Sequence, residues 1–115
     1  MPHFVIEYSR DVETRHDMNK IMQLAHDAGA ESGVMDPVDI KVRAYPCDHY
    51  RLLNEKDNFV HVTVYLLVGR SDAQKEKVAL ALREKLQGLL VDITSISVDI
   101  RDMNAIAYKK RLLPG

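Results

Sequence analysis

The sequence has very little cysteine: Cys47 is the only one among 115 residues. A single cysteine excludes an intrachain disulfide and cannot supply the repeated cysteine spacing of a zinc finger. The five histidines also lack the i, i+4 helical spacing that is typical of a metal site. The sequence therefore predicts neither a disulfide framework nor a bound metal.

Strong charge imbalance and long apolar runs are missing as well. The net charge is −1, so bulk electrostatics predict no nucleic-acid or membrane partner. No apolar run reaches the roughly 18 residues of a membrane helix, and no signal peptide follows Met1. With 46% hydrophobic and 29% charged residues, the composition is that of an ordinary globular protein. We expect one domain, residues 1–115, located in the cytoplasm.

Four segments alternate apolar and polar residues, which is the pattern of a strand with one buried face. They cover residues 3–8, 38–45, 59–68 and 94–101. The side chains expected on their buried faces are Phe4, Ile6 and Tyr8; Ile40, Val42 and Ala44; Val60, Val62, Val64, Leu66 and Val68; and Ile96, Val98 and Ile100. The opposite face of the second strand carries Lys41, Arg43 and Tyr45. Pro46 is expected to end this strand.

Two segments have helical spacing instead. The first runs from about residue 11 to 28, with Ser9 or Asp11 as its N-cap and with Gly29 and Gly33 as its stop. The second begins at a capping box of Ser71 and Gln74 and continues to about residue 90. The apolar residues at helical spacing are Met18, Ile21, Met22, Ala25 and Ala28 in the first helix, and Val78, Leu82, Leu86 and Leu89 in the second.

The order strand–helix–strand occurs twice, in residues 2–56 and 57–112. Two right-handed βαβ units predict an α/β fold of tandem repeats, with a four-stranded sheet and both helices on one face. The uncovered face favours an oligomer. Residues 47–57 are polar enough for a hairpin or an irregular excursion, and residues 105–113 are interpreted as a final short strand.

The N-terminus carries the main chemical candidate. Removal of Met1 would leave Pro2 with a free secondary amine at the start of a strand. In an apolar pocket beside cations, desolvation and like charge both disfavour the protonated amine. Such an amine is partly neutral at physiological pH and can take a proton from carbon. If Met1 stays attached, the Pro2 nitrogen is a tertiary amide with no basic lone pair.

The sequence resembles a known family at this N-terminus and at two later places. Met1-Pro2-His3-Phe4, Phe59-Val60-His61-Val62 and Gly69-Arg70-Ser71 resemble the 5-carboxymethyl-2-hydroxymuconate delta-isomerase family of the tautomerase superfamily. The second half, through Gly69-Arg70-Ser71-Asp72-Ala73-Gln74-Lys75-Glu76, is also similar to 4-oxalocrotonate tautomerase. The resemblance covers essentially the whole chain. It implies a homotrimer with the tautomerase fold, which macrophage-inhibitory-factor-like proteins share.

The resemblance also implies an activity and a set of site residues. The activity is cofactor-free keto–enol or 1,3-allylic isomerisation of an unsaturated di- or tricarboxylate from aromatic catabolism. Pro2 is the implied base, and Arg70 in the Gly-Arg-Ser turn is the implied carboxylate binder. A strand cation that polarises the keto acid matches either Lys41 or Arg43, and Ser97 stands at the corresponding place of the second repeat.

Two other functions stay open. One is a proline-based hydratase, dehalogenase or decarboxylase on the same fold. It would differ from an isomerase in whether Pro2 acts as an acid or as a base, and the pKa of Pro2 decides between these roles. A non-catalytic trimeric binding domain that kept the scaffold is favoured by a retained Met1 and by Lys41, because lysine lacks the bidentate fork that arginine offers a carboxylate.

Overall fold

The computed structural model describes all residues, 1–115, as a small α/β protein. The elements in chain order are β1 (His3–Ser9), α1 (Val12–Arg15), α2 (Met18–Glu31), a short 3-10 helix η1 (Pro37–Asp39), β2 (Lys41–Cys47), β3 (Phe59–Leu67), α3 (Asp72–Leu89) and β4 (Ser95–Met103). No helix combines the length and the apolar character that crossing a membrane requires.

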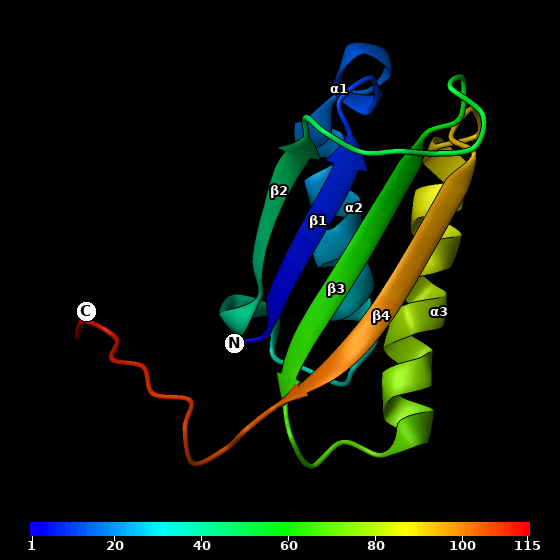
Figure 1. Ribbon diagram of the computed structural model, residues 1–115. Coiled ribbons are helices and arrows are strands. Elements are labelled where there is room, and N and C mark those ends of the chain that lie inside the picture. Colours follow the sequence, from blue (N-terminus) through cyan, green and yellow to red (C-terminus); the bar gives the residue numbers. More distant parts are fainter.

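The four strands form one mixed sheet in the order β2-β1-β3-β4. β1 pairs with β2 in parallel, β3 pairs with β4 in parallel, and the central pair β1–β3 is antiparallel. Both long helices lie behind the sheet in Figure 1, and the opposite face carries no helix. The predicted fold class, a four-stranded sheet with two helices on one face, is confirmed.

The core lies between this sheet and the two helices. Phe4, Ile6 and Tyr8 of β1 are buried there, as their alternation predicts. The remaining buried apolar side chains of the strands and long helices are Ile21, Ala25 and Ala28 of α2, Val60, Val62, Val64 and Leu66 of β3, and Val78, Leu82 and Leu86 of α3. The capping box also forms: the Ser71 side chain accepts from the Gln74 backbone, and the Gln74 side chain accepts from the Ser71 backbone.

The expected first helix is instead two helices. α1 ends at Arg15 and α2 begins at Met18, because the Asp17 side chain accepts a hydrogen bond from the Asn19 backbone at 2.9 Å and caps a new helix. α2 then continues through Gly29 to Glu31. Gly29 therefore does not stop the helix. A Cβ at this position would contact the ring of Phe4. The need for close packing, and not termination of the helix, therefore explains why a glycine occupies this position.

The second strand is shifted from its expected bounds. It begins at Lys41 and not at Val38, because the Asp36 side chain accepts from the Val38 backbone and starts η1. It also continues past Pro46 to Cys47. β2 is an edge strand, and an edge strand tolerates a proline because one of its sides has no ladder to satisfy.

Two further expectations at the chain's second half are wrong. Val68 is 55% exposed because it lies in the turn that follows the last residue of β3, although its backbone still donates to the Met103 carbonyl at 3.1 Å. The tail after β4 is a turn followed by extended chain, not a strand. The Asn104 side chain accepts from the backbones of Ile106 and Ala107 at 2.9 and 3.0 Å, and such an Asx turn diverts the chain from the sheet.

The directions of the strands determine which turns and strand ends lie at the same end of the sheet. His3, the first residue of β1, pairs with Tyr65 near the end of β3 and with Lys41 at the start of β2. The N-terminus, the start of β2, the β3–α3 turn and the tail after β4 consequently lie at one end of the sheet, the lower end in Figure 1. We call this the N-terminal end of the sheet.

Candidate active site

Pro2 is held at the N-terminal end of the sheet by the ladder itself. Its ring is buried, and its carbonyl accepts a hydrogen bond from the Lys41 backbone N–H at 3.1 Å. This bond extends the β1–β2 pairing by one residue beyond His3. The position of the Pro2 backbone is therefore fixed by two strands and not by a flexible terminus.

The amino group at this end has an unusually low pKa. Burial, and next the Lys41 side chain as hydrogen-bond partner and as positive charge, lower the pKa of the Met1 amine from 8.0 to about 6. Lys110 contributes further positive charge, while Asp39 acts in the opposite direction. An amine with this pKa is about nine-tenths neutral at pH 7. The surroundings of the chain terminus thus disfavour a positive charge, by both mechanisms predicted for Pro2.

A second polar group lies next to the terminus on the uncovered face of the sheet. The Arg43 guanidinium donates to His3 Nδ1 at 3.1 Å, and His3 Nε2 lies 2.9 Å from the Tyr108 hydroxyl. Because a guanidinium cannot accept, Nδ1 must be unprotonated, and the neutral ring carries its proton on Nε2. Burial and then the Arg43 charge lower the pKa of His3 below 6.5, which favours this neutral form.

Arg70 is partly buried in the β3–α3 turn at the same end of the sheet. Its Nη1 donates to the Leu67 carbonyl at 3.3 Å and its Nη2 donates to the Val34 carbonyl at 3.4 Å. These long bonds tie the turn to the segment between α2 and η1. A guanidinium has five N–H donors, so the remaining ones are free to bind a carboxylate.

The predicted site residues are brought to one end of the fold but are not all in contact. Lys41 lies beside the terminal amine, and its Nζ donates to the Asp39 carbonyl at 3.3 Å. Arg43 contacts His3 on the exposed face, one strand away from β1. In this single chain, Arg70 binds backbone carbonyls and no other site residue.

Sequence reasoning missed the C-terminal tail. Tyr108 and His3 are 105 positions apart in the chain, and Lys110 acts on both the terminal amine and His3. No local pattern links residues at such a separation. The one available signal was the basic run that begins at Lys109, whose position in space depends on the Asn104 turn.

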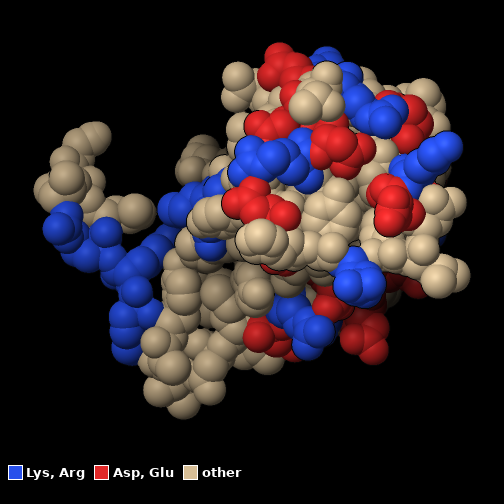
Figure 2. Space-filling model, turned by 45° about the horizontal axis from the view of Figure 1, so that its top comes forward, with Lys and Arg blue, Asp and Glu red and all other residues tan.

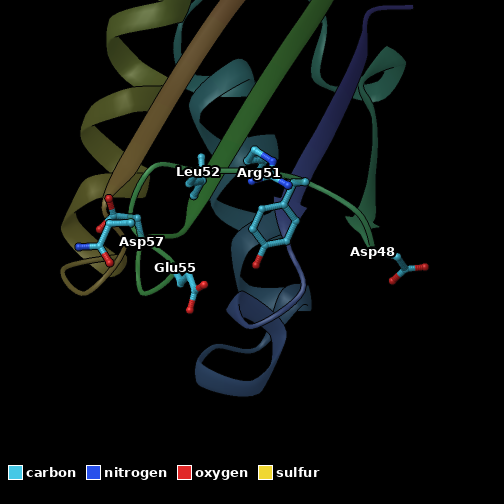
Figure 3. Close-up of a pocket in the computed structure, with 7 residues that line it drawn as sticks. Asp48, Arg51, Leu52, Glu55 and Asp57 are labelled. Carbon is cyan, nitrogen blue, oxygen red and sulfur yellow. The ribbon is translucent and has the colours of Figure 1, made fainter.

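The hollow drawn in Figure 3 is a different feature. It has a volume of about 400 Å³ and lies in the β2–β3 loop, at the opposite end of the sheet from Pro2. Asp48, Glu55 and Asp57 line it, with Arg51 as the only cation. Such a lining repels a carboxylate substrate. Another hollow, of about 440 Å³, lies at the N-terminal end of the sheet between Val68 and residues 102–106.

The family model for 5-carboxymethyl-2-hydroxymuconate isomerase matches residues 2–111. The chain belongs to this family. It is accordingly an isomerase, and the family predicted from the N-terminal motif and the Gly-Arg-Ser turn is confirmed. Comparison with curated proteins finds no match.

Several solved structures share this fold. A 5-carboxymethyl-2-hydroxymuconate isomerase from Deinococcus radiodurans is 22% identical, with a TM-score of 0.81 over 96% of this chain and 88% of that one. A 5-carboxymethyl-2-hydroxymuconate delta-isomerase is 20% identical, with a TM-score of 0.79 over 97% and 88% of the two chains. A fused 4-OT, solved as an asymmetric trimer, is 15% identical, with a TM-score of 0.72 over 94% and 91%.

Proposed function

We propose that this isomerase is a cofactor-free tautomerase that uses the amine of Pro2, exposed by removal of Met1, as its general base. Its substrate is an unsaturated 2-hydroxy or 2-oxo di- or tricarboxylate resembling 5-carboxymethyl-2-hydroxymuconate. The observation that carries the proposal is the position of Pro2: its carbonyl accepts from the Lys41 backbone at 3.1 Å, and the terminus beside it lies next to the Lys41 side chain, which with partial burial lowers the pKa of the Met1 amine to about 6. Family membership supports the reaction class.

The chemistry follows from the lone pair of this amine. Neutral Pro2 removes a proton from the carbon next to the carbonyl and returns it at another carbon of the conjugated system. Negative charge develops on the substrate oxygen while the proton is on Pro2. Fixed cations stabilise this enolate more than the ground state, which accelerates the reaction.

The cations of the site divide between two roles. Lys41 lies beside the Met1 amine and lowers its pKa, so after Met1 removal it is placed to disfavour a charged Pro2 amine and to stabilise the enolate oxygen. Arg43, which already donates to His3, is the alternative strand cation. Arg70 is assigned to a substrate carboxylate because its guanidinium has donors left beyond the two that bind backbone carbonyls.

The surroundings of the chain terminus also favour the proposal over a hydratase or dehalogenase on the same fold. A structure of a cis-3-chloroacrylic acid dehalogenase family member matches this fold with a TM-score of 0.74 at 13% identity. Acid catalysis by Pro2 would require its amine to be protonated at neutral pH, whereas the burial and the Lys41 charge that lower the pKa of the Met1 amine at this terminus disfavour a protonated amine. These surroundings therefore favour a base.

A homotrimer is part of the proposal. The sheet face opposite the helices is uncovered in the single chain (Figure 1), and a fused 4-OT of the same fold is a trimer. Sedimentation equilibrium of the purified protein at several concentrations tests this assembly. A monomer at all of them would contradict it.

The base is tested by comparing the wild type with Pro2→Ala, after intact mass has established that Met1 is absent from both. Ketonisation of phenylpyruvate enol and of a hydroxymuconate is followed by absorbance. We expect Pro2→Ala to lower kcat by about 10²-fold or more, the usual contribution of a general base. Pro114→Ala, at an exposed proline of the tail, is the matched control and should retain full activity. Equal rates for the wild type and Pro2→Ala would refute the base.

A further inference from the structure

The C-terminal tail is basic and leaves the body of the protein at the N-terminal end of the sheet. Residues 104–115 follow β4, and Figure 2 shows cationic atoms along the projecting tail with no acidic atoms among them. Exposed apolar and basic side chains fill most of this segment. Tyr108 is the exception, because it is half-buried while its neighbours on both sides are exposed.

Two sets of contacts fix the direction of the tail. The Asn104 side chain accepts from two backbone N–H groups, and the Asn104 carbonyl accepts from the Tyr108 backbone at 3.0 Å. This turn places the Tyr108 hydroxyl 2.9 Å from His3 Nε2. The two rings also meet edge to face, with centroids 5.9 Å apart and planes at 67°. The tail is thus attached to the residue that follows Pro2.

We propose that residues 104–111 are part of the active site: Tyr108 positions this segment on His3, and Lys110 binds a distal carboxylate of the substrate. This inference rests on the proposed function and names the residue that would select a di- or tricarboxylate over a monocarboxylate. Lys110 is suited to the role because it lies two residues after Tyr108, which holds the tail 2.9 Å from His3 Nε2, and because its charge acts on the Met1 amine from the tail while Lys41 acts on it from β2.

The His3 ring links the tail to the sheet in a defined protonation state. Arg43 occupies Nδ1 as a donor, so the remaining proton on Nε2 is available to the Tyr108 oxygen. Protonation of His3 would place a donor on Nδ1 opposite the Arg43 donor and break one end of this chain. The groups acting on His3 are Arg43 and Lys41 from β2, the terminal amine, and Lys110 from the tail. Burial of the ring and the positive charges of Arg43, Lys41 and Lys110 disfavour a protonated His3, which keeps the tail attached.

The test uses three variants of the chain that lacks Met1: Lys110→Gln, Tyr108→Phe, and Lys109→Gln as the matched control. Lys109 is the adjacent exposed lysine and is not among the main charges that lower the pKa of the Met1 amine or of His3. We expect Lys110→Gln and Tyr108→Phe to raise KM for a hydroxymuconate tricarboxylate by about 5-fold, with little change in kcat. KM for phenylpyruvate, which has one carboxylate, should change less. Lys110→Arg should restore the wild-type KM.

A second readout does not depend on turnover. The chain is labelled with ¹⁵N-proline, and the Pro2 nitrogen is titrated by NMR in each variant. Loss of the Lys110 charge should raise the pKa of the Pro2 amine, and Lys109→Gln should leave it unchanged. If Lys110→Gln behaves like Lys109→Gln in both KM and amine pKa, the proposal is wrong even when the wild type is a proline-dependent isomerase. If the processed wild type has no isomerase activity, the proposed function is refuted, and the titration alone decides whether the tail lies at the amine.

Discussion

Substitution of Gly29 by alanine tests how the core positions the N-terminal strand. Gly29 lies inside α2, where alanine would ordinarily be preferred. A Cβ at this position would approach Phe4 Cζ to 2.8 Å, Ile40 Cδ1 to 3.0 Å and Met35 Sδ to 3.2 Å. Phe4 is fully buried on β1, two residues after Pro2. Gly29→Ala therefore forces the ring of Phe4, and with it the start of β1, to move.

The two opposing contributions can be compared. Overpacking a core costs about 1–3 kcal/mol. Alanine regains about 1 kcal/mol over glycine in a helix. Ile40 Cδ1 and Met35 Sδ are flexible ends that can give way, but the Phe4 ring is rigid and enclosed. We take the upper half of the overpacking range and expect a net loss of about 1–2 kcal/mol, which lowers Tm by about 4–8 °C for a domain of this size.

The assay is thermal unfolding followed by circular dichroism at one fixed protein concentration, because assembly also affects Tm. Gly88→Ala is the matched control. Gly88 lies in the last turn of α3, and nothing is within 4 Å of its added Cβ. This variant should gain about 0.5 kcal/mol, or about 2 °C in Tm. Isomerase activity should fall in Gly29→Ala only. An equal rise in Tm for both variants would show that Gly29 is not constrained by Phe4.

Three further predictions concern the site. Arg70→Ala should raise KM for carboxylate substrates by about 10-fold, whereas Arg83→Ala, on the exposed side of α3, should have little effect. If Arg70→Ala raised KM equally for an enol without a carboxylate, the role of Arg70 would be misassigned. Arg43→Gln should raise the pKa of His3, measured by NMR titration, because it removes a positive charge from the ring; an unchanged pKa would exclude the contact. His3 has a folded-state pKa below 6.5, so its contribution to stability is complete above pH 6.5 and is lost as the pH falls through the folded-state value. Chemical denaturation at several pH values should show this loss in the wild type but not in His3→Gln, and identical pH dependence would contradict it.

Much of the fold could be predicted because each strand packs one apolar face against the core, fully buried in β1 and β3 and partly buried in β2 and β4. The alternation of Phe4, Ile6 and Tyr8 identified the first strand and its direction toward the core. The errors arose where a polar side chain redirected the backbone, as Asp17 does by capping α2 and Asn104 by turning the tail. Short side chains of this kind make local hydrogen bonds in several conformations, so their effect depends on the surrounding chain. Pro46 was misjudged because its tolerance depends on β2 being an edge strand, which is a property of the sheet order.

The candidate site could be predicted only in part. The βαβ order is enough to bring Pro2 and the start of β2 to one end of the sheet, whereas the β3–α3 turn joins them because β1 and β3 run antiparallel, which the sequence does not reveal. The sequence does not reveal that Arg43 donates to His3, or that the tail returns to it through Tyr108. These are contacts between side chains far apart in the chain, and they depend on register and on the Asn104 turn.

The central claim is that isomerisation requires an unblocked Pro2 nitrogen. The most direct measurement prepares the same chain with different extents of Met1 removal, determines the processed fraction by intact mass, and measures kcat/KM for a hydroxymuconate on each sample. The account predicts an activity proportional to the fraction of chains that begin at Pro2 and close to zero when Met1 is fully retained. Activity that is independent of this fraction would contradict it.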